Sequence, residues 1–250
     1  MNRLLFLFLL VILAACAKEP APAPDISPPG QGEEPGQPAP AKDTIRYLAL
    51  GDSYTIGQSV SVSQRWPVQL AAQLQAELPD TIYYIDAPSI IARTGWTTGS
   101  LLQAIASAED TLAPPYSLVS LLIGVNNQYQ NRPIDIYRAE FRELLERAIS
   151  FAGNDPSRVI VLSIPDYAYT PFGQASFNPT LISSQIDQYN AINLGITQEY
   201  GVAYFDITAI SRRGLEEPWL VASDGLHPSG AMYALWVAEA LEYVVGALME

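Results

Sequence analysis

Residues 48–57 have the sequence LALGDSYTIG, in which an apolar run meets a polar turn. The apolar run, residues 45–50, is typical of a strand buried in a sheet, and it stops at Gly51. Ser53 follows the end of this strand, where α/β folds with parallel strands bind their ligands. Gly, Asp and Ser are also common turn formers, so the triplet alone predicts no more than a turn.

The only histidine of the chain, His227, lies in the stretch SDGLHPS at residues 223–229. Asp224 precedes it by three residues, so a tight turn brings the carboxylate within reach of the imidazole. Serine, histidine and aspartate from separate segments are the components of an activated nucleophile. We expect Ser53 to be the nucleophile, His227 the base and Asp224 the acid that orients it. A loop histidine and a helix-capping aspartate are the alternatives.

Strand-like and helix-like segments alternate from residue 44 onward. The expected strands are residues 45–50, 81–86, 117–123, 158–164 and 202–207, and the expected helices span residues 66–78, 101–108, 137–152, 182–196 and 233–248. Strands separated by helices need crossover connections, which produce a parallel sheet covered on both faces. The prediction is an α/β/α sandwich of three layers with a five-stranded parallel sheet. Its informative loops, residues 51–57, 87–98, 124–133, 165–177 and 223–230, are expected at one rim.

Acyl transfer also needs hydrogen-bond donors aimed at the developing oxyanion. Asn126 follows the third predicted strand in the stretch GVNN, and its side-chain amide is a candidate donor. Gly95 lies in the stretch RTGW and offers a backbone N–H that no side chain obstructs. The N–H of Ser53 is the third expected donor. Simple turns also explain the stretches around Gly95 and Asn126.

Four blocks in this order resemble the SGNH or GDSL hydrolase family: Gly51-Asp52-Ser53-Tyr54, Gly95, Gly124-Val125-Asn126-Asn127 and Asp224-Gly225-Leu226-His227-Pro228. The resemblance covers residues 44–250. It implies a flavodoxin-like fold and an esterase or lipase-type serine hydrolase, with the catalytic and oxyanion residues named above. Tyr54 replaces the leucine of the family's name. Asn127 replaces an aspartate found in many members, which leaves its role open.

The amino-terminal segment is typical of an exported lipoprotein. A basic start and an apolar run precede Cys16, the single cysteine, and residues 13–16 resemble the lipobox of bacterial lipoproteins. We expect residues 1–15 to be a signal peptide and residues 16–43 to be a lipidated Cys16 with a disordered, proline-rich tether. The hydrolase domain, residues 44–250, would then be anchored in the bacterial cell envelope, at the outer membrane, through palmitate-type acyl chains. An ordinary signal peptide beside a cysteine is the alternative.

The composition of the chain limits the kinds of partner that it is expected to bind. The formal net charge of −13 argues against nucleic acid, and the sequence has no metal-ligand cluster or dinucleotide fingerprint, so no cofactor or metal is expected. The predicted function is a serine esterase acting on O-acetylated carbohydrate or on a lysophospholipid-like lipid. The alternatives are a catalytically idle domain that binds glycan or lipid and a structural lipoprotein. Tyr167, Tyr169 and Phe172 are expected to overhang the site, as an acyl or sugar platform or as packing for their loop.

Overall fold

Strand β2 (Tyr47–Gly51) is part of a five-stranded parallel sheet in the computed structural model, which describes residues 41–176 and 178–249. The strand order is β4-β2-β5-β6-β7, and the other strands are β4 (Ser89–Ala92), β5 (Leu118–Leu122), β6 (Val159–Leu162) and β7 (Ala203–Phe205). All four pairings are parallel. Every residue of β2, β5 and β6 is buried, which explains why these segments are almost continuously apolar.

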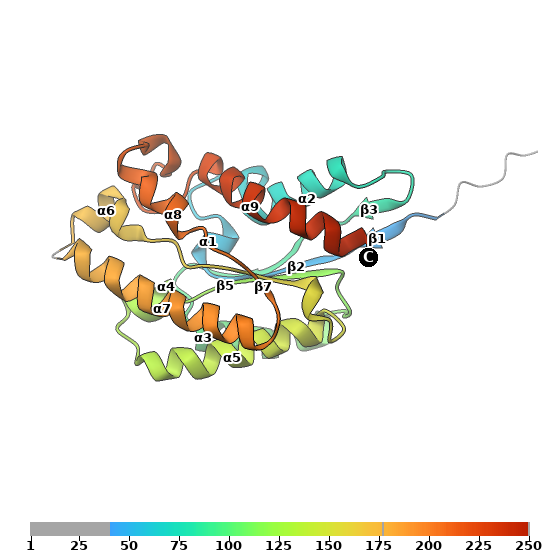
Figure 1. The fold of residues 1–250 in the computed structure, drawn as a ribbon, viewed down its shortest axis with the longest axis horizontal. Helices are drawn as coiled ribbons and strands as arrows, with labels where there is room; N and C mark the ends of the chain where they lie inside the picture. Colours follow the sequence, from blue (N-terminus) through green and yellow to red (C-terminus); the bar gives the residue numbers. More distant parts are fainter. Residues whose placement is uncertain (1–40, 177, 250) are drawn as a thin grey trace, which may run out of the picture. The chain divides into compact units, whose positions relative to one another are not determined.

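Helices cover both faces of this sheet. Figure 1 shows α2 (Trp66–Glu77) and α9 (Gly230–Met249) on one face. The other face carries α3 (Thr98–Ala108), α5 (Ile134–Phe151) and α7 (Pro179–Glu199). The predicted three-layer α/β/α sandwich with a five-stranded parallel sheet is therefore confirmed.

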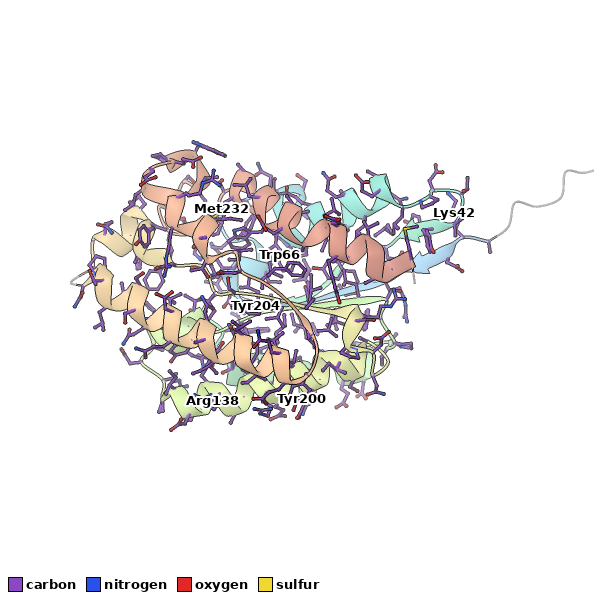
Figure 2. The ribbon with its side chains drawn as sticks, viewed as in Figure 1. Lys42, Trp66, Arg138, Tyr200, Tyr204 and Met232 are labelled. Carbon is purple, nitrogen blue, oxygen red and sulfur yellow. The ribbon has the colours of Figure 1, made fainter. Side chains whose placement is uncertain are left out.

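The apolar stripes seen in the sequence face the sheet. In α5 the buried residues are those of the predicted stripe: Tyr137, Phe141, Leu144, Leu145 and Ala148. Trp66 begins α2 and is buried between the sheet and the helices (Figure 2), while Pro67 occupies the first turn, where a missing N–H does no harm. Helix α9 is long and apolar enough to cross a bilayer, but Tyr233 and Trp236 on one of its faces are fully buried in the core.

The prediction places one strand in the wrong sheet. Residues 81–86 were expected in the main sheet, but β3 (Tyr83–Ile85) pairs instead with β1 (Asp43–Ile45) in a separate two-stranded sheet. The fifth strand of the main sheet is β4, within the predicted loop 87–98. Strand β4 forms the sheet's edge, and only its last residue is fully buried, so its sequence lacks the long apolar run of a central strand.

The loops at the carboxyl ends of the strands carry short helical elements. These are α1 (Ser53–Ile56) after β2, α4 (Val125–Tyr129) after β5, and η4 (Tyr167–Tyr169) with α6 (Pro171–Gln174) after β6. The remaining short elements are η1 (Val62–Gln64), η2 (Glu109–Thr111), η3 (Pro156–Arg158), α8 (Thr208–Ser211), η5 (Arg212–Leu215) and η6 (Pro218–Leu220).

The sheet reverses its winding direction between β2 and β5. From β2 the main sheet continues to β4 on one side, and the chain then returns to β5 on the other. Such a switch point opens a crevice at the carboxyl ends of the two strands, which is the usual ligand site of open α/β sheets. Ser53 follows one of these strands and Asn126 the other.

The predicted signal peptide, Cys16 and nearly all of the predicted tether lie outside the described residues. Strand β1 begins at Asp43, one residue before the predicted start of the domain, and residues 41–250 form one compact unit.

Candidate active site

A cavity of about 240 Å³ lies at the carboxyl ends of the strands. Four loops that follow strands line it, together with the segment before α9. The lining residues are Ser53, Tyr54, Thr94, Gly95, Val125, Asn126, Tyr129, Tyr167, Phe172, Leu226 and His227. Each of the five segments expected at one rim therefore contributes to a single cavity.

Ser53 begins α1 and is almost fully buried beside the cavity. The preceding residue, Asp52, caps this short helix by accepting the N–H of Tyr54 at 3.0 Å. Burial raises the pKa of Asp52 to about 7, although the nearby backbone N–H groups of Tyr54 and Gly124 act to lower it. The Asp52 carboxylate thus lies near both the serine turn and Gly124, which follows β5.

His227 and Asp224 form a close polar pair beside the cavity. The imidazole Nδ1 lies 2.6 Å from Asp224 Oδ2, and Asp224 Oδ1 accepts the N–H groups of Leu226 and His227 at 3.0 Å each. The turn that makes this possible has Gly225 in the left-handed region, with a φ of 72°. The ring of Tyr54 meets the imidazole edge-on, with 5.8 Å between the ring centroids. Backbone hydrogen bonds to Asp224 and the ring contact of Tyr54 with His227 therefore hold the pair in place.

Ser59 supplies a further hydrogen bond to this carboxylate that the sequence did not suggest. Its hydroxyl donates to Asp224 Oδ2 at 2.5 Å. Ser59 also has a φ of 65°, a conformation that is uncommon for residues other than glycine. Burial acts to raise the pKa of Asp224, but the donors from Ser59, His227 and Leu226 outweigh it and hold that pKa well below its usual range. Asp224 therefore stays ionised under mildly acidic conditions.

Two of the three predicted oxyanion residues, Gly95 and Asn126, lie on loops that are bonded to each other. The Asn126 amide donates to the carbonyl of Trp96 at 3.0 Å, and the Gln130 amide donates to the carbonyl of Gly95 at 3.1 Å. Because an amide nitrogen carries two hydrogens, Asn126 keeps one for another acceptor. Gly95 has a φ of 83°, and a β-carbon there would meet no atom within 4 Å. Glycine is needed at this position for its backbone conformation.

Asn127, whose role the sequence left open, lies beneath this loop pair. It is buried, accepts the N–H of Thr98 at 2.9 Å and donates to the Thr98 hydroxyl at 2.7 Å. That hydroxyl in turn donates to Glu140 of α5. Asn127 therefore holds α4, which carries Asn126, against the start of α3, just after the Gly95 loop.

Aromatic side chains also line the cavity. Of the three aromatic residues predicted to overhang the site, Tyr167 and Phe172 do line it, but Tyr169 does not. The Tyr169 ring lies against the guanidinium of Arg212, whose Cζ is 5.9 Å from the ring centroid. Tyr129 is a lining residue that the sequence analysis missed. Its position three residues after Asn126, on the same face of a helical turn, was the available signal.

The residues that the structure describes contain no group of three or more His, Cys, Asp or Glu side chains arranged to hold a metal ion.

Comparison with known proteins places the chain in a family. The sequence profile of the GDSL-like lipase/acylhydrolase family matches residues 49–235, which include all four blocks. The chain belongs to this family. The resemblance inferred from the four blocks is thus confirmed, and so is the enzyme class, a GDSL-type ester hydrolase.

A curated relative and two solved structures extend the comparison. The acetylxylan esterase of Xylanibacter ruminicola is 27% identical over 212 residues, which cover 77% of this chain but only 41% of that protein. A lipolytic G-D-S-L family member from Veillonella parvula superposes with a TM-score of 0.59 at 17% identity, covering 79% of this chain and 97% of the other. The acetylxylan esterase Axe2 from Geobacillus stearothermophilus gives 0.58 at 21% identity, covering 80% and 94%. These structures share the fold.

Replacing Asn127 with aspartate tests its contact with Thr98, next to the loops of Gly95 and Asn126. Asn127→Asp puts a second carboxylate oxygen against the Thr98 hydroxyl, whose single hydrogen already bonds Glu140. We expect the free energy of unfolding in urea to fall by about 3 kcal/mol, because the Thr98 N–H still bonds one oxygen of the buried carboxylate but the second oxygen has no donor. The loss should grow from about pH 5 to about pH 8, since burial disfavours the ionised form.

The exposed Asn154 is the matched control. Asn154→Asp should change the free energy of unfolding by less than about 0.5 kcal/mol. Wild-type stability of Asn127→Asp across this pH range would contradict the role assigned to Asn127.

Proposed function

We propose that the chain is a serine esterase that hydrolyses acyl esters through Ser53, His227 and Asp224. His227 removes the proton of the Ser53 hydroxyl as this oxygen attacks the ester carbonyl, and Asp224 orients the imidazole and stabilises its charged form. The observation that carries the proposal is that Ser53 and His227 line one cavity, with His227 bonded to Asp224 at 2.6 Å.

The tetrahedral oxyanion would be stabilised by the N–H groups of Ser53 and Gly95 and by the free amide hydrogen of Asn126. All three residues line the same cavity. His227 then donates this proton to the alcohol, which leaves, and an acyl-enzyme remains on Ser53. His227 next removes a proton from a water molecule as that water attacks the acyl carbonyl. His227 finally returns the proton to the Ser53 oxygen, and the carboxylic acid is released.

Two substrate classes remain, O-acetylated carbohydrate and lysophospholipid-like lipid. The 27%-identical acetylxylan esterase of Xylanibacter ruminicola supports the first, although the match covers only 41% of that protein.

Export and lipid anchoring at Cys16 form a second part of the proposal, supported by the sequence of residues 1–43. Residues 1–15 would be removed, and Cys16 would carry acyl chains that hold residues 44–250 at the cell envelope, on a tether of residues 16–43. The partners would then be an ester substrate and a membrane, and not nucleic acid.

Removing the Ser53 hydroxyl should abolish ester hydrolysis. We expect kcat of Ser53→Ala on ethyl acetate to fall by about 10⁶-fold, because the nucleophile is lost while the fold is kept. A fluorophosphonate probe should label the wild type at Ser53 and leave the variant unlabelled, and the exposed Ser107→Ala should behave as wild type. A wild-type protein that neither hydrolyses esters nor takes the label would identify an idle binding domain.

The Ser59 hydroxyl is expected to affect catalysis through its hydrogen bond to Asp224. We expect Ser59→Ala and Ser59→Gly to lower kcat about tenfold, the effect of one lost hydrogen bond to a charged group. Without this donor the pKa of Asp224 rises towards its usual range. Asp224 is then protonated at a higher pH than in the wild type, so the acidic limb of the plot of kcat/KM against pH shifts to higher pH.

The two replacements separate the hydroxyl from the backbone, because glycine accepts the positive φ of Ser59 without strain. Ser63→Ala, in the same loop, is the control. Full activity of Ser59→Gly together with an unshifted profile would exclude a positioning role for the hydroxyl.

Lipidation can be followed with labelled palmitate in a bacterial host. The wild type should incorporate label and fractionate with membranes, whereas Cys16→Ser should do neither, because serine lacks the thiol that carries the lipid. Lys18→Ala, in the same segment, should be labelled as the wild type is. Export of the wild type without label would support an ordinary signal peptide.

A further inference from the structure

Three aromatic rings on one side of the cavity form a continuous surface, which we call the aromatic wall. Its members are Tyr129 of α4, Tyr167 of η4 and Phe172 of α6, and all three line the cavity. The ring centroids lie 6.3 Å apart for Tyr129 and Tyr167, 6.3 Å for Tyr129 and Phe172, and 6.4 Å for Tyr167 and Phe172. Loops that follow two different strands thus build one apolar surface.

Two rings of the aromatic wall are open to solvent. Tyr129 is 56% exposed and Phe172 is 43% exposed, whereas Tyr167 between them and the core is buried. Adjacent exposed rings at the mouth of a cavity mark a surface that gains free energy when a ligand covers it. A long acyl chain on so open a surface would keep much of its own area in water.

The aromatic wall is held in place before any ligand arrives. The Tyr167 hydroxyl donates to Gln128 at 2.9 Å, and Gln128 donates in turn to Gln185 of α7 at 2.7 Å. The Phe172 N–H donates to the carbonyl of Gly225 at 2.9 Å, which connects α6 to the turn between Asp224 and His227. A surface fixed in this way loses little conformational entropy on binding.

The cavity offers no charge to a ligand. No Lys, Arg, Asp or Glu occurs among the lining residues within the described part of the chain. A phosphate headgroup that entered the cavity would lose its hydration and find no cationic partner, which is costly in an apolar site. Thr94 and Asn126 add polar groups to the lining of the cavity. The cavity therefore combines apolar rings with uncharged polar groups, as a sugar ring combines an apolar face with a hydroxylated edge.

The spacing along α4 indicates which part of the ester meets the aromatic wall. Asn126 and Tyr129 are three residues apart, so they share a face and lie about 4.5 Å apart along the helix axis. An acetyl group has one carbon beyond its carbonyl, too little to cover a surface of three rings. With the carbonyl at Asn126, the rings are left for the alcohol part of the ester.

We propose that the aromatic wall binds a neutral pyranose ring on the alcohol side of the scissile ester, which makes the substrate an O-acetylated carbohydrate. The inference rests on the proposed esterase function. The electropositive C–H groups on one face of the sugar pack against the electronegative faces of Tyr129 and Phe172. The sugar hydroxyls are then left for the polar groups of the cavity and for solvent.

The test compares acetyl esters that differ only in the alcohol. O-Acetylated xylo-oligosaccharides and O-acetylated glucose carry a pyranose, whereas ethyl acetate does not, and acetate release is measured for each. In Tyr129→Ala and Phe172→Ala, the ratio of kcat/KM for the sugar esters to that for ethyl acetate should fall about tenfold. Nitrophenyl esters are unsuitable because their aromatic leaving group would itself stack on the rings.

Three control variants separate ring stacking from other effects. Tyr129→Phe keeps the ring and should keep the wild-type ratio, whereas Phe172→Leu keeps apolar volume without a ring and should lower it. Tyr84 is a tyrosine of similar exposure, 52%, that lies in β3 and does not line the cavity. Tyr84→Ala should leave both activities unchanged, and thermal melts of all variants check that the fold is kept.

The outcomes distinguish this inference from the proposed function. A wild-type protein that hydrolyses none of the esters overturns the esterase itself. Two results would overturn the role of the aromatic wall alone. In the first, the wild type hydrolyses ethyl acetate but none of the sugar esters. In the second, the alanine variants keep the wild-type ratio of kcat/KM for sugar esters to that for ethyl acetate. Alanine variants that instead lose ethyl octanoate hydrolysis relative to ethyl acetate would assign the rings to an acyl chain, and that also overturns the proposal.

Discussion

The close approach of β2 and β5 at their carboxyl ends sets the geometry of the site. Gly51 is paired with Leu122 in the parallel register, and Ser53 and Gly124 each follow two residues later. A β-carbon on Gly51 would lie 2.5 Å from the carbonyl oxygen of Leu122 and 2.1 Å from the Thr55 hydroxyl. Only glycine leaves room for this close approach of the Leu122 carbonyl and the Thr55 side chain. The loop of Ser53 and the loop of Asn126 therefore leave the sheet side by side.

Beyond the sheet, the site loops are held mainly by one another. Asn126 and Gln130 bond the carbonyls of Trp96 and Gly95, and Phe172 bonds the carbonyl of Gly225. Each of these bonds joins segments that follow different strands. Such cross-links position polar groups before a substrate binds, which is how preorganised sites stabilise developing charge without reorganising.

Sequence-based prediction succeeded for the elements whose residues are buried. The central strands and the α5 stripe were predicted because their residues are buried, and burial leaves a continuous or periodic apolar pattern. Residues 81–86 were placed in the wrong sheet because their β-branched and aromatic residues indicate a strand but not its partner. The edge strand β4 was missed because it is short and partly exposed. Strand pairing is a property of the folded chain, and local propensity does not contain it.

The sequence by itself determined the family, the parallel α/β class and the set of loops that meet at one rim. Apolar periodicity and four polar blocks are local features, and parallel strands bring their carboxyl ends to one edge whatever their order. The tertiary structure alone decided that Tyr129 joins Tyr167 and Phe172, that Tyr169 turns away to Arg212, and that Ser59 bonds Asp224. Ser59 and Asp224 are 165 residues apart, and a contact across such a separation depends on how whole elements pack.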